Sequence, residues 1–298
     1  MNRNLYCIIL ILTIIVTACG NDTPPANQTN SRSEHPMKEK AARLNRDGLA
    51  LFNSGKYADA LGLFIEAARV DPEEAEYANN SGNCRLRLGE ARRAFKDFEK
   101  AVTLQPDRPL YRFNLGLAHM HLNEPEKAAM RFNEALRLDD AFAPAWAHLG
   151  LVYYREKKLN EAESAWEKAA ALEKNAEVEN NLGMVCMERG ELDRAEKRFR
   201  RAIEIDGNFI LSHYNLGVLY QKRNDSARAE KAYSSAIALD PTHFTAYYNR
   251  ALVQLAQGKD RDAIASLELF IEHCPPTLVR PLADARSRLS ELRKNRLH

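Results

Sequence analysis

One spacing recurs seven times along this chain. In each copy a small residue is followed after twelve positions by Ala and after sixteen by a bulky apolar residue, and most copies have a further Ala after nineteen. The copies begin at Gly48, Gly82, Gly116, Gly150, Gly183, Gly217 and Ala251. They lie 34 residues apart, apart from one step of 33. A period of this length is typical of a solenoid built from stacked supersecondary units.

The period and the pattern resemble the tetratricopeptide repeat, whose unit is a pair of antiparallel helices. With the small residue placed at position 8, the units begin at Ala41, Ala75, Pro109, Ala143, Ala176, Ile210 and Phe244. The resemblance implies an all-α, right-handed superhelical solenoid of seven helix-turn-helix repeats over residues 37–277. Solenoids present surfaces to partners and seldom perform chemistry. The resemblance therefore implies a protein that binds proteins.

Residues 278–298 carry an apolar residue every three or four positions, as one face of a helix does. These residues are Leu278, Leu282, Ala285, Leu289 and Leu292. Phe270 stands where earlier units have a small residue that would admit another repeat, so we expect the last helix to cap the seventh unit. The fourth unit is one residue short around 173–175, which we expect to bend the solenoid between a four-repeat and a three-repeat arm.

The chain begins with an apolar run from Leu5 to Val16, about half of the ~20 residues that a spanning helix needs. Such a run is typical of a signal peptide. Residues 16–19 resemble a bacterial lipobox, in which the Cys is lipidated and becomes the new N-terminus. The resemblance predicts a signal peptide over residues 1–18, lipidation at Cys19 and a polar tether over residues 19–36. Gly20 in place of Asp favours sorting to the outer membrane, facing the periplasm.

The net charge of +2 provides no broad field to attract nucleic acid, so we expect no nucleic-acid partner. Cys84, Cys186 and Cys274 remain after the signal peptide and Cys19 are set aside. The first two lie three repeats apart, beyond the ~7 Å between Cα atoms that a disulfide allows. We expect buried free thiols.

The first helix of each unit, helix A, is apolar on two sides. Positions 4, 7, 8 and 11 should pack against the second helix, helix B. Positions 2, 5, 6, 9, 12 and 13 lie opposite and form what we call the A face. In the resembled family this face lines a groove for partner segments, and the alternative is that its side chains pack against the next repeat. The aromatic candidates for the groove are Phe113, Tyr154, Tyr214 and Tyr248.

Position 6 of the A face is mostly asparagine. The residues are Asn80, Asn114, Asn181, Asn215 and Asn249, with His148 in the fourth unit. An amide offers both a donor and an acceptor, and the row resembles the asparagine ladders that pair with the backbone of an extended peptide. This hypothesis expects alanine at Asn181, Asn215 and Asn249 to spare the fold and weaken binding. The alternative is a purely structural role.

No Gly-rich phosphate loop, zinc motif or nucleophile elbow appears in the sequence. His119 and His121 are two apart on a helix and point to different sides, so we expect no metal pair. The sequence thus predicts a protein that is not an enzyme and that uses no cofactor. The basic residues of the chaperone-binding carboxylate clamp are also missing, since Asn45 and Leu110 stand at two of its places.

These observations predict a membrane-tethered scaffold of the bacterial envelope that binds a protein or an extended peptide. Resemblance to multi-repeat lipoproteins of similar layout implies a pilotin-like factor that assists a type IV pilus secretin. An adaptor for peptidoglycan hydrolases and a lipoprotein enzyme stay open as alternatives. The sequence does not name the partner.

Anchoring is predicted to depend on Cys19, because the apolar run is too short to hold the mature protein in a bilayer. We expect Cys19→Ser to give protein that remains unlipidated. Mass spectrometry of the N-terminal peptide is the measurement. A wild-type peptide without lipid mass would show that the lipoprotein interpretation is wrong.

Overall fold

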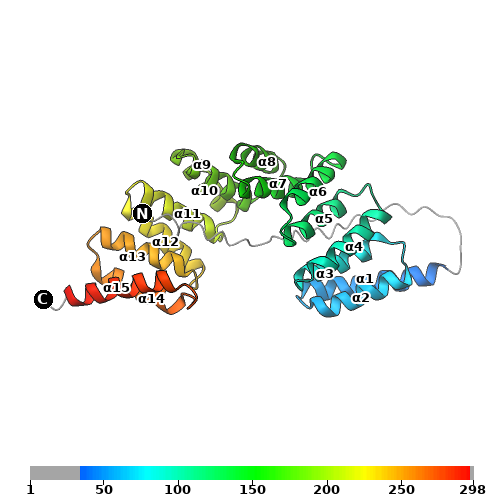
Figure 1. Cartoon of the computed structure of the whole chain (residues 1–298), viewed down its shortest axis with the longest axis horizontal. Coiled ribbons are helices and arrows are strands. Elements are labelled where there is room, and N and C mark those ends of the chain that lie inside the picture. Colours follow the sequence, from blue (N-terminus) through cyan, green and yellow to red (C-terminus); the bar gives the residue numbers. More distant parts are fainter. Residues whose placement is uncertain (1–33, 296–298) are drawn as a thin grey trace. The chain divides into compact units, whose positions relative to one another are not determined.

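The computed structural model describes residues 34–295, which form fifteen α-helices joined by short turns (Figure 1). In chain order these are α1 (Glu34–Asn53), α2 (Tyr57–Val70), α3 (Ala75–Arg87), α4 (Ala91–Leu104), α5 (Pro109–His121), α6 (Pro125–Leu138), α7 (Ala143–Arg155), α8 (Leu159–Leu172), α9 (Ala176–Glu188), α10 (Leu192–Ile205), α11 (Ile210–Lys222), α12 (Ser226–Leu239), α13 (Phe244–Ala256), α14 (Asp260–His273) and α15 (Val279–Asn295). The predicted signal peptide, Cys19 and most of the tether lie outside the described residues. Within 34–295, no helix combines the length and the hydropathy that crossing a bilayer requires.

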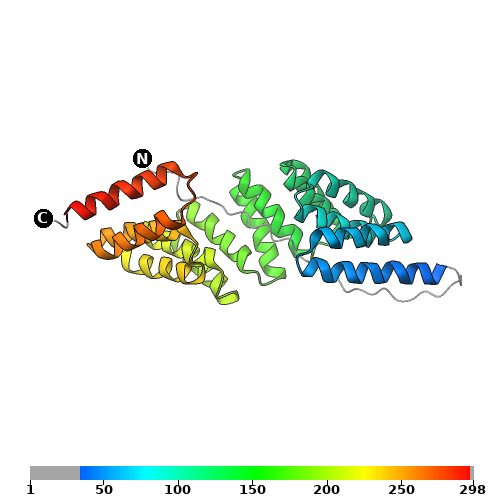
Figure 2. The same ribbon diagram turned by 90° about the horizontal axis from the view of Figure 1, so that it is seen from below.

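The helices pack as seven antiparallel pairs followed by α15, which confirms the predicted all-α repeat fold (Figures 1 and 2). Each odd-numbered helix from α1 to α13 is a helix A, and the even-numbered helix after it is the helix B of the same repeat. One boundary is corrected. Helix α1 begins at Glu34, so residues 34–36 belong to the first helix and not to the tether.

The described chain forms two compact units that divide between Leu172 and Glu173. Residues 34–172 contain α1–α8, which are four repeats. Residues 173–295 contain α9–α15, which are three repeats and the last helix. The division falls where the fourth repeat lacks one residue.

Helices A and B of a repeat meet at the recurrent glycine. A Cβ added to Gly116 would lie 2.5 Å from Cε1 of Phe132, the bulky residue sixteen positions later. At Gly150 the same atom would lie 2.6 Å from Trp166 Cδ1. Both rings are almost completely buried. The small residue and the bulky residue of the repeat are therefore two halves of one contact, in which a ring lies directly on the backbone of helix A.

A left-handed residue joins helix A to helix B in every repeat. Position 15 has a positive φ in all seven, from 58° at Asn123 to 79° at Gly190. Glycine and asparagine tolerate this conformation, and they fill six of the seven places. Lys157 is the exception, with φ of 61°. The turn ends helix A abruptly and reverses the chain onto the glycine.

Helix α15 covers the end of the seventh repeat, as the sequence predicts (Figure 2). Its Leu282, Ala285 and Leu289 are buried in the same cluster as Phe270. Ala285 occupies position 8 of an eighth repeat, so α15 stands in the place of a further helix A. On the side where a helix B would pack, Asp284 pairs with Arg288 at 2.7 Å. This charged side ends the stack.

The glycine contact predicts opposite effects for two Gly→Ala variants. Gly116→Ala drives a methyl group into the buried Phe132 ring, and we expect a loss of about 1–3 kcal/mol in the free energy of unfolding. Gly62 lies in α2 with no atom near the place of a Cβ, so Gly62→Ala should gain up to about 1 kcal/mol from helix propensity. Denaturant unfolding of both variants tests the pair. Equal effects at the two positions would contradict the contact.

Candidate protein-binding face

The asparagines of the predicted ladder connect neighbouring repeats. In four cases the Nδ2 of position 6 donates a hydrogen bond to the position 5 side chain of the preceding repeat, 35 residues earlier. The bonds run from Asn80 to Asn45 Oδ1 (2.9 Å), from Asn114 to Asn79 Oδ1 (2.6 Å), from Asn215 to Asn180 Oδ1 (2.9 Å) and from Asn249 to Tyr214 Oη (3.0 Å). Two of them lie within residues 34–172 and two within residues 173–295. We call this set of bonds the inter-repeat amide row.

The amide row explains why asparagine, a poor helix former, recurs at position 6 inside helix A. Asn80, Asn114 and Asn249 are 6 %, 3 % and 4 % exposed, so each amide would be unsatisfied without its partner. A peptide could pair with these donors only by displacing a bond between repeats. The contacts thus support the structural alternative at these three positions.

In the fourth repeat His148 stands at position 6 in place of asparagine, and an aromatic contact to the preceding repeat replaces the hydrogen bond. Its ring meets Phe113, again 35 residues earlier, edge to face with centroids 5.0 Å apart. Its Nδ1 lies 2.9 Å from the Pro144 carbonyl oxygen. Burial lowers the pKa of His148 to about 4, so the ring is neutral at pH 7. An uncharged ring packs on Phe113 without a counter-ion.

Asn181 differs from the other members of the row. It has no hydrogen-bond partner among residues 34–295, and its side chain is half-buried. The preceding position 5 is Ala147, which has no side-chain acceptor. Both the donor and the acceptor of this amide are therefore available to a ligand.

The four aromatic groove candidates are packing residues in the structure. Phe113 is wholly buried, while Tyr154, Tyr214 and Tyr248 are 4 %, 9 % and 8 % exposed. Phe113 contacts Phe132 and Phe142 as well as His148. The prediction that Phe113 lines an open groove is wrong, because stacking of the next repeat covers position 5.

Half-buried apolar and amide side chains remain on the A face of residues 173–295. They are Asn181, Met184, Met187, Asn215, Leu252 and Leu255, from α9, α11 and α13. We call them the methionine patch. The patch offers flexible apolar surface together with amide groups, a combination that suits a peptide with both side-chain and backbone contacts.

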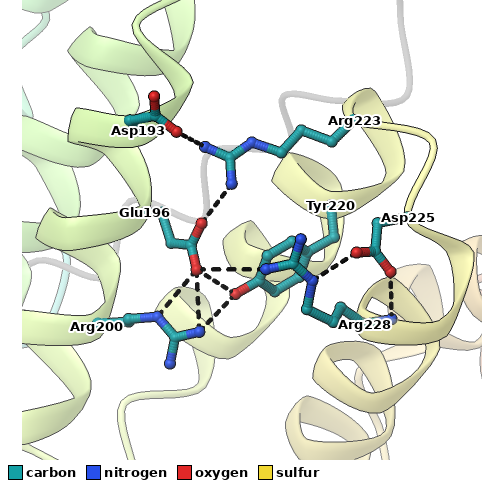
Figure 3. Close-up of polar contacts among 7 residues, drawn as sticks. All are labelled: Asp193, Glu196, Arg200, Tyr220, Arg223, Asp225 and Arg228. Carbon is teal, nitrogen blue, oxygen red and sulfur yellow. Dashed lines mark hydrogen bonds and ion pairs between the residues drawn. The ribbon is translucent and has the colours of Figure 1, made fainter.

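Charge on the neighbouring helices of the same unit is mutually neutralised (Figure 3). Glu196 of α10 accepts hydrogen bonds from Tyr220 Oη at 2.7 Å, from Arg200 at 3.0 Å and from Arg223. Burial alone would raise the pKa of Glu196, but these bonds outweigh it and lower the pKa below its usual value. Arg223 also pairs with Asp193 at 2.5 Å. The network ties α10 to α11 and leaves Arg223 with two carboxylates.

The three thiols are buried, as predicted, and the two histidines of α5 differ in their burial. Cys84, Cys186 and Cys274 are buried and form no disulfide within residues 34–295, and burial raises the pKa of Cys84 to about 12. His119 is buried with its Nδ1 2.7 Å from Glu124 Oε2, whereas His121 is exposed. Within residues 34–295 no group of three or more His, Cys, Asp and Glu side chains is placed to hold a metal ion.

Sequence reasoning missed the partner positions of the amide row. Position 5 is Asn45, Asn79, Asn180 or Tyr214 wherever position 6 of the next repeat is Asn with a partner, and it is Phe113 where position 6 is His148. This matching at 35 residues was a readable signal. It links position 5 of one repeat to position 6 of the next repeat. It is not visible when each position is compared only with the same position in other repeats.

Comparison with known proteins agrees with this geometry. Sequence profiles described as tetratricopeptide repeat match residues 46–109, 85–141 and 113–177, residues 174–242, and residues 216–293. This chain belongs to the tetratricopeptide repeat family. No curated protein matches the sequence.

Solved structures share the fold at low sequence identity. The structure of Pseudomonas aeruginosa PilF is 19 % identical with a TM-score of 0.63, over 75 % of this chain and 99 % of that one. A tetratricopeptide repeat protein from Parabacteroides merdae is 18 % identical with a TM-score of 0.61, over 85 % and 99 %. YrrB, described as having an unusual peptide-binding site, is 23 % identical with a TM-score of 0.51, over 63 % and 97 %. At these identities the likeness concerns the fold.

The amide row predicts a difference between two asparagines that occupy the same position of the repeat. Asn114→Ala leaves the buried Asn79 Oδ1 without its donor, at a cost of about 1–3 kcal/mol, of which better helix propensity returns less than about 0.7. Asn181→Ala removes no hydrogen bond among residues 34–295 and should be neutral or slightly stabilising. Thermal unfolding of the two variants is the measurement. If Asn114→Ala were as stable as the wild type, the amide row would carry no stability.

Proposed function

We propose that this chain is a lipid-anchored scaffold of the bacterial envelope that holds an extended segment of a partner protein on the methionine patch. The observation that carries the proposal is Asn181. It is a half-exposed amide without a partner, in a row where the other asparagines are occupied. An unoccupied amide on an apolar face is a natural anchor for the backbone of a bound peptide.

Anchoring through Cys19 supports a place in the envelope, with the tether holding the repeats away from the membrane. A more specific proposal is a pilotin-like role in which the partner is a type IV pilus secretin subunit. This rests on the layout of a lipobox followed by tetratricopeptide repeats. The fold shared with PilF is compatible with it.

Site-specific crosslinking in cells tests both levels of the proposal. A photo-crosslinking amino acid at Met187 lies within the methionine patch, and the same amino acid at Lys231 lies exposed on helix B of the same unit. We expect a secretin subunit to be captured from position 187 and little from position 231. Asn181→Ala combined with the probe at position 187 should weaken the capture, because the anchoring amide is lost.

The outcomes separate the two levels. Capture of a different envelope protein from position 187 alone, weakened by Asn181→Ala, would keep the scaffold and reject the secretin. Equal capture from positions 187 and 231 would reject the methionine patch as the binding surface.

A further inference from the structure

The A face of residues 34–172 has a different chemistry from the methionine patch. At position 13 of the second, third and fourth repeats it bears Arg87, His121 and Arg155, all exposed. Position 13 lies one turn after position 9, on the same side of the A face as position 6. In the other unit the same position bears Glu188, Lys222 and Ala256, so the basic character is confined to residues 34–172.

We infer that Arg87, His121 and Arg155 form a docking row for an acidic segment of a partner protein. The inference rests on the proposed scaffold function and adds a second contact, on the other unit, with its own chemical preference. We call these three residues the basic row.

The two arginines of the basic row have no carboxylate partner. Among residues 34–295 no ion pair involves Arg87 or Arg155, whereas Arg85, Arg112 and Arg131 of the same unit are paired. Arg85, two residues before Arg87 on α3, pairs with Asp97 at 2.5 Å. Arg223 in the other unit holds two carboxylates. A cation left unpaired in such a chain is an available site for an anion.

Among the described residues, the neighbours of Arg87 and Arg155 do not neutralise the charge of the two guanidinium groups. The guanidinium carbon of Arg87 lies 5.5 Å from the centroid of the Tyr57 ring and 6.0 Å from that of Phe52. These rings hold the side chain in position and carry no net charge. Arg155 contributes to lowering the pKa of the buried His148, so its field acts on the A face. Burial also lowers the pKa of Arg155 itself, and no carboxylate offsets this effect.

The nearest acidic residues along the chain are already engaged. Glu90 pairs with Arg93 at 3.2 Å, Glu124 with Lys127 at 3.1 Å, and Glu156 with Lys158 at 2.7 Å. Glu76 is on the A face of α3, but it lies eleven residues before Arg87, or about 16 Å along the helix. It accepts a hydrogen bond from Asn45 at 3.0 Å. None of these carboxylates compensates the basic row.

The spacing of the row suits an extended peptide. Helices A of neighbouring repeats touch, as α3 and α5 do, so equivalent positions are about 10 Å apart. A segment in the polyproline II conformation covers that distance in about three residues, which is one turn, so every third side chain returns to the same side. A segment with an acidic residue at every third position would bring carboxylates to Arg87 and Arg155. Burial lowers the pKa of His121, so its neutral ring would meet the carboxylate between them as a hydrogen-bond donor. Leu151, half-buried one turn before Arg155, would meet an apolar side chain of the segment.

Fluorescence anisotropy with defined peptides tests this inference. The full chain, in a nonionic detergent at low salt, is titrated into a labelled peptide that repeats Glu-Ser-Gly and into a matched peptide that repeats Gln-Ser-Gly. We expect the acidic peptide to bind about tenfold more tightly and to lose this advantage in salt. The Arg87→Gln, Arg155→Gln double variant should remove most of the preference.

The control removes the same charge elsewhere in the same unit. Arg92 and Lys96 are exposed on α4, on helix B, and form no ion pair among the described residues. The Arg92→Gln, Lys96→Gln variant should bind the acidic peptide within about twofold of the wild type. Melting temperatures of both variants check the fold.

Several results would overturn the basic row. They are equal binding of the two peptides, no binding of either, an equal loss in both double variants, or an unchanged affinity in Arg87→Gln, Arg155→Gln. Binding of anionic phosphatidylglycerol vesicles in place of the acidic peptide would reject a protein partner for this row. None of these results bears on crosslinking from position 187, so the proposed scaffold function stands or falls separately.

Discussion

The contact between the position 8 glycine and the ring at position 24 is the constraint on which the rest of the structure depends. A ring that lies on bare backbone fixes the separation of helices A and B and their rotation about their own axes. Once the rotation is fixed, positions 4, 7, 8 and 11 face helix B and the A face is turned away from it. This orientation determines where the amide row, the methionine patch and the basic row lie. Glycine within a helix is about 1 kcal/mol less favourable than alanine, and the contact with the ring requires glycine despite this loss.

Stacking of repeats then divides the A face between packing and exposure. Position 5 is covered by the next repeat, which is why Phe113 is fully buried and Tyr214 nearly so. Position 6 supplies the amide that joins one repeat to the preceding one. Position 13 is exposed in every repeat, whereas positions 9 and 12 are half-buried in some repeats and buried in others. Part of the A face therefore packs between repeats and is not open to a partner, because each repeat of a solenoid is held only by its neighbours.

The two units differ in whether arginines near the A face are paired with carboxylates. In residues 173–295 the carboxylates of α10 pair with Arg223, and the A face bears the methionine patch together with Glu188 and Lys222, which have opposite charges. In residues 34–172 Arg87 and Arg155 have no such partners. One repeat architecture therefore presents an apolar face in one unit and a basic row in the other. Because the backbone contacts are set by positions 8, 20, 24 and 27, the residues at position 13 are free to vary.

The sequence by itself determined the repeat number, the helix pairing, the capping helix and the burial of the thiols. It did so because a pattern that recurs in register averages out local ambiguity, and because helix period and glycine spacing are local properties. It also predicted which side of helix A packs against helix B. Only the tertiary structure decided which residues of that face are open. Asn114 and Asn181 are the same residue at the same position, yet one is bonded and buried while the other is half-exposed without a partner. The difference lies in the acceptor that a neighbouring repeat brings to the amide, and such a pairing between repeats exists only once the chain has stacked.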